Sequence, residues 1–408
     1  MVLRRQRFLP RLVIFTMFLI GPVAAIGGIG LVPVLVIMGL AGAYYCLAER
    51  NLAAALDREI LILLAMFVVL GVVSGLWAPV ALRAVSLPLK IALLSILGLL
   101  AFRSLNSLDP KDLERAELAL VAGVGGGFLI VAGAYAYTLT TGRPLWGSES
   151  GNSMTYLSTG QAALGLVAWP VSAIVFKRWG VKAAVAFFFA VVVIFSFLSF
   201  FAVLLGLAVG AAMLVATVLT KSRVLAPIGV LVAVLVLLAP VIIMLTPNAD
   251  ILYEKFSFVW PSGVHRFYIW QFVTERIGEN PFFGWGMDSS RFIPGGHDRI
   301  QWRGQNAWMG ELLPLHPHNA ALQVWLELGF AGALLMAVFV CKLFIRRSRL
   351  PGETLKNGFY AAAAGTYLTM GAFSYGIWQN WWVALGWLVP AIIGAVLGED
   401  VTDTKAIS

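Results

Sequence analysis

The stretch HPHNAALQVWLELGFAGALL, residues 316–335, joins two histidines to an apolar run that continues to residue 343. A helix needs roughly 20 apolar residues to cross a bilayer, so the run predicts a transmembrane helix over residues 317–343. Pro317 suits the first helical position, because the N–H that it lacks has no helical partner there. The stretch therefore places titratable side chains at the mouth of a membrane span.

The same apolar character recurs along the whole chain. Of the 408 residues, 60% are hydrophobic and only 12% are charged. These proportions are typical of a polytopic membrane protein. We predict an all-α helical bundle of about twelve transmembrane helices. The expected spans are residues 12–27, 30–47, 59–77, 84–102, 115–137, 159–176, 183–198, 200–220, 224–246, 317–343, 358–377 and 380–397.

Basic residues alternate between the connections of these spans. The N-terminal segment MVLRRQRFLPR holds four arginines, which predicts that it stays in the cytoplasm. Most of the 29 lysines and arginines then fall in connections on that same side, and both termini are expected there. The net charge of +9 is thus a topology signal, and no nucleic-acid partner is predicted.

One long connection, residues 247–316, interrupts the series of spans. We interpret residues 1–408 as a single membrane domain with this loop as its large extramembrane insertion. The loop is too rich in tryptophan and phenylalanine for a solvated coil, so it is expected to pack on the bundle. A helix is predicted from Val264 to Gly278 with Ser262 as its N-cap. Gly284 and Gly286 later in the loop allow close backbone approach.

The histidines of the chain are confined to this loop and its exit: His265, His297, His316 and His318. In the first turn of a helix, His318 would feel the positive end of the helix dipole, which keeps its ring neutral and able to accept a proton. The alternative is a pair of interfacial histidines bonded to backbone carbonyls. Two histidines with no nearby carboxylate make a poor metal site, so neither a metal nor another cofactor is predicted.

Arg266 shares the apolar face of the predicted loop helix with Trp270. Its planar guanidinium can donate two parallel hydrogen bonds to a diphosphate, which lysine cannot do. The alternative is a structural ion pair with a nearby acid, for which the sequence offers Glu275, Glu279 and Asp288.

Three further charged residues are weaker candidates. Arg143 lies beside Trp146 in a smaller outer loop, residues 138–158, and is a second possible diphosphate-binding residue. Lys90 lies within the fourth span, where charged residues often have functions, although its long side chain can also reach the membrane surface. Glu327 lies nine residues beyond His318, which predicts the opposite face of that helix.

Three stretches in this order resemble the O-antigen ligase and O-antigen polymerase superfamily: SGVHRFYIW (262–270), ENPFFGWG (279–286) and the stretch at 316–335. The resemblance implies a GT-C-like multi-pass protein of the bacterial inner (cytoplasmic) membrane with a periplasmic active site. It also implies a metal-independent, inverting glycosyltransferase. The expected donor is a glycan on undecaprenyl diphosphate, and the acceptor is lipid A-core or a growing glycan in the membrane.

Carried over residue by residue, the resemblance assigns acceptor deprotonation to His318, with His316 as its partner and Asn319 as the next motif residue. It assigns diphosphate binding to Arg266. Ligases of the family often carry a Ser-Arg pair that is absent here, where the chain reads Leu-Ser-Phe-Phe at residues 198–201. A second cation must then come from Arg143, Arg83 or Lys90, or be absent.

This departure leaves polymerisation of O-antigen or exopolysaccharide repeat units nearly as well supported as ligation. The alternative from another class is a transporter for a lipid-linked or polar solute. Transporters usually place polar groups near the middle of the membrane, whereas the polar residues of this chain gather outside it.

Overall fold

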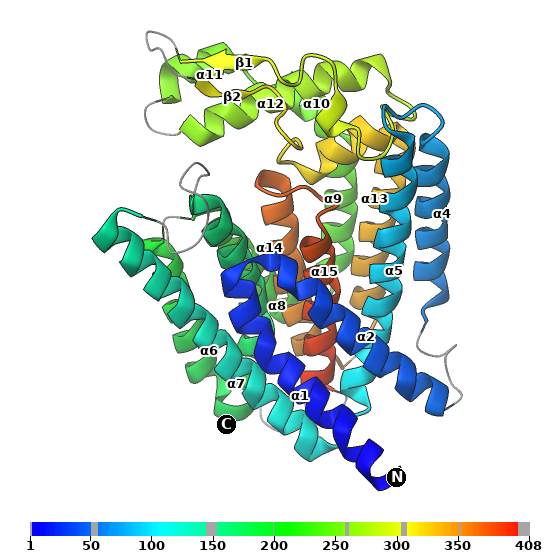
Figure 1. Ribbon diagram of the computed structural model, residues 1–408, viewed down its shortest axis with the longest axis vertical. Helices are drawn as coiled ribbons and strands as arrows, with labels where there is room; N and C mark the ends of the chain where they lie inside the picture. Colours follow the sequence, from blue (N-terminus) through cyan, green and yellow to red (C-terminus); the bar gives the residue numbers. More distant parts are fainter. Residues whose placement is uncertain are drawn as a thin grey trace.

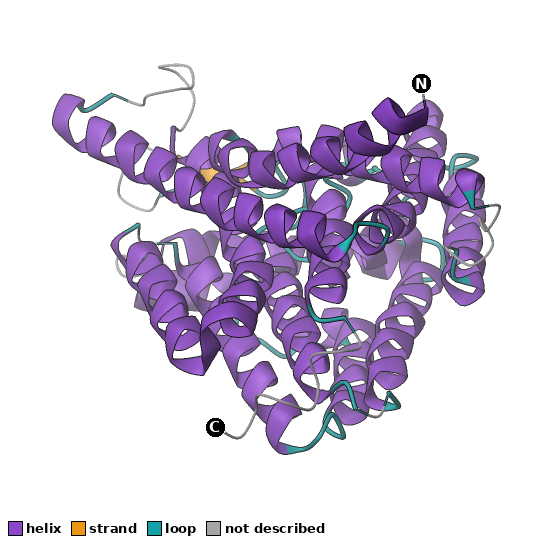
Figure 2. Ribbon diagram, turned by 90° about the horizontal axis from the view of Figure 1, so that it is seen from below, coloured by secondary structure: helices purple, strands orange, loops and turns teal. Residues whose placement is uncertain are grey.

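The computed structural model describes residues 2–49, 56–143, 153–198, 200–257, 261–302, 308–350 and 352–398. Helices make up nearly all of the regular structure (Figure 2). They are α1 (Val2–Ile26), α2 (Leu31–Ala48), α4 (Arg58–Ser74), α5 (Ala81–Asn106), α6 (Pro110–Thr141), α7 (Ser153–Phe197), α8 (Phe201–Leu219), α9 (Leu225–Leu237), α10 (Ala239–Met244), α11 (Ala249–Phe256), α12 (Pro261–Glu279), α13 (Ala320–Ser348), α14 (Thr354–Phe373) and α15 (Asn380–Val396), with the 3-10 turns η1 (Gly28–Gly30) and η2 (Ser290–Phe292). One small hairpin pairs β1 (Arg299–Gln301) with β2 (Trp308–Glu311).

The predicted all-α membrane bundle is confirmed. Seven helices among the described residues are long and apolar enough to cross a membrane, and α9 and α15 are shorter apolar helices. Each of the predicted runs overlaps a helix, and α7 covers two of them because its path bends at Gly180 (φ 80°). That all of these helices cross the bilayer stays a prediction.

The segment between α9 and α13 forms a separate layer across one end of the bundle (Figure 1). The start of α1 and the end of α15 lie toward the opposite end (Figure 1). Apolar residues of α12 pack against the start of α13, with Ile269, Val273 and Leu322 fully buried. This contact fixes α12 against the N-terminal end of α13. Which end faces the periplasm stays a prediction.

The predicted loop helix is observed as α12, but its N-cap was predicted wrongly. The helix begins at Pro261, so Ser262 lies inside it. Proline is favoured at a first helical position because its φ is already helical, and this extends the helix beyond the predicted start. The β1–β2 hairpin was not predicted, because strands of three and four residues carry too little alternation to recognise.

A break in α13 lets the loop dock against a membrane helix. Gly329 adopts a left-handed conformation (φ 61°), which separates the carbonyls of residues 326 and 327 from their usual helical donors. The loop replaces the missing bonds: the Trp285 and Gly286 N–H groups donate to these carbonyls over 2.8 and 2.9 Å. On the far side of the break, the Phe330 N–H donates to the Pro281 carbonyl over 2.8 Å. The irregular backbone is therefore satisfied within the protein, as a membrane environment requires.

The close approach predicted at Gly284 is confirmed. Its φ is +67°, and a Cβ there would lie 2.5 Å from the Glu327 carbonyl carbon. Any other residue would push the loop away from the broken helix.

A buried ion cluster joins α6 to α7. Glu117 has a side chain only 1% exposed, and it accepts from Lys177 at 2.7 Å and from Arg178 at 2.8 Å. Removing it leaves two cations without their buried partner, so we expect Glu117→Ala to lower the free energy of unfolding by about 3 kcal/mol. Thermal unfolding of the detergent-solubilised protein measures this loss.

Glu114 provides the matched control for this prediction. It accepts from the same Arg178 at 3.0 Å, but its side chain is 60% exposed. Glu114→Ala should therefore cost less than about 1 kcal/mol. Equal losses in the two variants would show that burial of Glu117 contributes nothing.

Candidate functional site

His318 lies just before α13, not within its first turn. The Asn319 side chain accepts from the Leu322 N–H at 3.1 Å and caps the helix, which begins at Ala320. The prediction that Pro317 is the first helical residue is therefore wrong. An asparagine oxygen satisfies a free helical N–H, and the Pro317 carbonyl instead accepts the Trp270 indole N–H at 2.9 Å. His318 adopts φ 54°, a conformation uncommon for residues other than glycine.

The His318 ring is held in one tautomer. Its Nδ1 lies 2.7 Å from the Ser374 carbonyl, which can only accept, so Nδ1 carries the proton. Nε2 therefore keeps its lone pair, and no described residue donates to it. Burial lowers the pKa of His318 to about 4, assisted by the charges of Arg266 and His265 and opposed by the Ser374 carbonyl. The ring is thus neutral near pH 7 and able to accept a proton at Nε2.

His316 packs against His318, with ring centroids 4.4 Å apart. Its Nδ1 accepts the backbone N–H of His318 at 3.2 Å, so the proton lies on Nε2, which faces the Gln379 amide at 3.4 Å. The Gln379 atom facing this proton is best assigned as the oxygen. Burial lowers the pKa of His316 to about 3, assisted by His318 and Arg291. The buried His316 ring thus holds the backbone and the ring of His318 in place.

Arg266 approaches the histidine pair from α12. Its charge lowers the pKa of His318, which places the guanidinium within electrostatic reach of that ring. Burial lowers the pKa of Arg266 itself, opposed by Tyr375. Nη1 donates to the Ser262 carbonyl at 3.0 Å, while the buried Nε has no partner among the described residues. This guanidinium retains unused donors beside a neutral base.

The alternative reading of Arg266 as half of an ion pair finds no support among the described residues. Glu279 pairs with Arg276 at 2.6 Å, and Asp288 lies 3.5 Å from Arg83. Glu275 is exposed on α12 and forms no ion pair with described residues.

No described contact joins the other basic candidates, Arg143, Lys90 and Arg83, to the two histidines. Arg143 is exposed just after α6, and its neighbour Trp146 lies outside the described residues. Lys90 is exposed on α5 and has no hydrogen-bond partner in the described part of the chain. Ser199, where the family's Ser-Arg pair is missing, also lies outside the described residues. Arg83 stands over the Phe292 ring, 5.4 Å from its centroid, beside η2.

Sequence reasoning missed the connection between α14 and α15, residues 374–379. Ser374 and Gln379 contact the two histidines, and a Cβ at Gly376 would lie 3.0 Å from the His316 ring. The contacts are made by a backbone carbonyl, by a side-chain amide and by a glycine without a side chain. None of these leaves a recognisable sequence motif. Arg291 was also missed, although its charge reaches His316 from η2.

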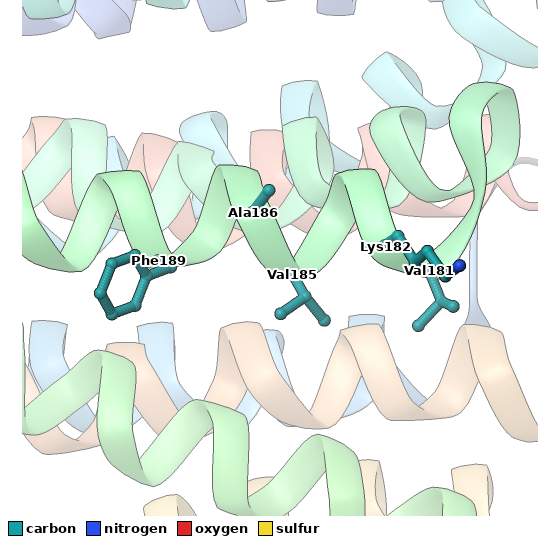
Figure 3. A pocket seen from close by; sticks show the side chains of 5 residues that line it. All are labelled: Val181, Lys182, Val185, Ala186 and Phe189. Atoms are coloured by element: carbon teal, nitrogen blue, oxygen red, sulfur yellow. The ribbon is translucent and has the colours of Figure 1, made fainter.

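A shallow surface pocket lies elsewhere, on α7. Its lining is Val181, Lys182, Val185, Ala186 and Phe189 (Figure 3). The lining is almost entirely apolar and contains none of the predicted site residues. It is typical of a helix surface that faces lipid rather than of a reaction site.

Comparison with known proteins supports the same region. Residues 202–337 match the family model described as O-antigen ligase, and they include Arg266, His316 and His318. A "Putative polysaccharide ligase" of Rickettsia conorii is 38% identical over 151 residues, which cover 37% of this chain and 36% of that protein. A protein of the same name from Rickettsia prowazekii is 35% identical over 154 residues, again 37% and 36% of the two chains.

The similarity to each of these relatives thus spans about a third of its length. The family-model match, residues 202–337, falls on the part of the chain that the sequence motifs singled out. The predicted resemblance is confirmed over this range, because residues 202–337 match the O-antigen ligase family model.

Proposed function

We propose that this protein is a membrane glycosyltransferase of the O-antigen ligase type. It moves a glycan from undecaprenyl diphosphate to an acceptor hydroxyl at the periplasmic face of the bacterial inner membrane. The observation that carries the proposal is the neutral His318 ring, with Nδ1 anchored and Nε2 available, beside the Arg266 guanidinium. A base and a diphosphate-binding cation are the two groups that such a transfer needs.

The proposed reaction is a single displacement. His318 Nε2 takes the proton of the acceptor hydroxyl, and that oxygen attacks the anomeric carbon of the donor sugar. The bond from this carbon to the diphosphate oxygen breaks with inversion, and Arg266 stabilises the negative charge of the departing undecaprenyl diphosphate. The step as proposed uses no metal ion.

The remaining candidates have supporting roles in this proposal. His316 orients His318, and Asn319 caps α13 so that the pair stays at the helix mouth. A second cation for the diphosphate is proposed among Arg291, Arg143, Arg83 and Lys90. Arg291 ranks first, because its charge already reaches His316.

Repeat-unit polymerisation uses the same chemistry with a growing glycan as the acceptor. The names of the relatives, which call them polysaccharide ligases, favour ligation. Reconstitution with an undecaprenyl-diphosphate glycan and lipid A-core decides between them. Ligation moves the glycan to the second lipid, whereas polymerisation lengthens it on undecaprenyl diphosphate; absence of both products would refute the proposal.

The dependence of the rate on pH tests the base directly. The proposed base works only when unprotonated, so kcat/KM should fall as pH drops through the pKa of His318, about 4. If the base were an exposed histidine, kcat/KM would instead fall near pH 6.5. Profiles measured on the reconstituted enzyme between pH 4 and pH 8 separate the two cases. An acid limb at the ordinary histidine value would contradict a buried His318 base.

A further inference from the structure

The Glu327 carboxyl group accepts four hydrogen bonds from described residues and has no part in the proposed reaction. It is fully buried near the break in α13. Oε1 accepts from the Ser290 hydroxyl at 2.5 Å and from Gln323 Nε2 at 3.0 Å. Oε2 accepts from the Asp288 N–H and the Trp378 indole N–H, each at 2.7 Å. A carboxylate can only accept, so four converging donors match its two oxygens.

Two of these contacts lead to the α14–α15 connection. Trp378 belongs to that connection and binds the carboxylate directly. Gln323 links to it indirectly, because its Oε1 accepts the Ile377 N–H at 3.0 Å while its Nε2 donates to Glu327. Glu327 and Gln323 therefore hold residues 377 and 378 from one side.

The same connection holds the histidines on its other side. The Ser374 carbonyl sets the His318 tautomer, and Gln379 faces His316 Nε2. Gly376 lies between the two groups: a Cβ there would be 3.0 Å from the His316 ring and 3.3 Å from Gln323 Oε1. A shift of this short segment should move both imidazoles, because the Ser374 carbonyl holds His318 Nδ1 and the other described bond of the His316 ring runs only to the His318 backbone.

We propose that Glu327 and Gln323 are positioning residues that place the His316–His318 pair by fixing the α14–α15 connection. In this proposal neither residue contacts the substrate. The expected effect on rate rests on the proposed function, whereas the placement of the imidazoles does not. The proposal also explains why an acidic side chain lies in the membrane-spanning helix nine residues beyond His318 without forming an ion pair among the described residues.

A matched pair of variants tests this role. Gln323→Leu and Ser290→Ala each remove one hydrogen bond to the same Glu327 oxygen. Only the first also releases the Ile377 N–H and with it the connection. Gln323→Leu should lose more thermal stability in detergent than Ser290→Ala, because it also leaves the Ile377 N–H without its acceptor. Ser290→Ala therefore controls only for the lost hydrogen bond to the carboxylate.

The first readout needs no glycan. Modification of His316 and His318 by diethyl pyrocarbonate, located by mass spectrometry, should be faster in Gln323→Leu than in wild type. Deuterium exchange across residues 374–379 should also quicken. Ser290→Ala should match wild type in both measurements. Equal behaviour of the two variants would overturn the positioning role, whatever reaction the protein performs.

The second readout is transfer from undecaprenyl-diphosphate glycan by the reconstituted full-length protein. Displacing a base by about 1 Å lowers a rate by about a hundredfold, so kcat of Gln323→Leu should fall that far while KM for the donor stays near wild type. Ser290→Ala should keep wild-type kcat. If the wild-type protein transfers no glycan, the proposed function fails, and the labelling experiment still decides the positioning role.

Discussion

Replacing His318 by asparagine should lower kcat for glycan transfer by about 10²–10⁴-fold, the usual contribution of a positioned general base. Asparagine tolerates the positive φ of this position better than alanine does, so the variant removes the base without adding backbone strain. His318→Ala should likewise abolish transfer while the protein still reaches the membrane. Product formation per folded enzyme, from reconstituted protein checked by thermal unfolding, measures the effect.

His297 supplies the control for this experiment. It is exposed, and its Nδ1 lies 3.2 Å from the Glu311 carboxylate, away from the histidine pair. His297→Asn should therefore turn over like wild type. Wild-type turnover of His318→Asn would remove His318 from the chemistry altogether.

Replacing Arg266 by lysine should remove most of the activity although the charge is kept. The guanidinium can offer two parallel donors to a diphosphate, whereas an ammonium acts as a point charge. A lost hydrogen bond to a charged group costs about 1.5–3 kcal/mol, which corresponds to a loss of about 10- to 100-fold in kcat/KM. Steady-state kinetics with varied donor glycan measure this loss.

Arg276 offers a matched control on the same helix. It pairs with Glu279 and lies over the Phe272 ring, with no contact to the histidines in the described structure. Arg276→Lys should leave kcat/KM near wild type. If Arg266→Lys also retains wild-type turnover, the diphosphate role of Arg266 is wrong.

A neutral replacement of Arg266 gives an independent check through pH. The Arg266 charge helps to lower the pKa of His318, so Arg266→Gln should move the acid limb of kcat/KM to higher pH. Arg266→Lys keeps the charge and should move it less. An unshifted limb in Arg266→Gln would place the guanidinium too far from His318 to act on it.

The principal candidates could be found from sequence because their residue types are rare in this chain. Four histidines in one segment, and an arginine on an apolar helix face, stand out against a background that is 60% hydrophobic. The backbone geometry around these residues could not be predicted as well from the sequence. Whether Pro317 or Ala320 begins α13 depends on the Asn319 cap, and on the Trp270 indole that binds the Pro317 carbonyl from another element.

Hydropathy and charge alone determined that this chain is an all-α membrane bundle, because each span must be long enough to cross a hydrocarbon layer and must bond its own backbone. Only the tertiary structure decided that α13 breaks at Gly329, that the loop at 281–286 completes the broken backbone, and that residues 374–379 hold the histidines. These contacts join residues 41 to 63 positions apart through backbone groups and buried polar atoms, which local periodicity does not record. The Glu327 carboxylate shows the difference most clearly: its position in a span is visible in the sequence, whereas its four donors come together only in the folded protein.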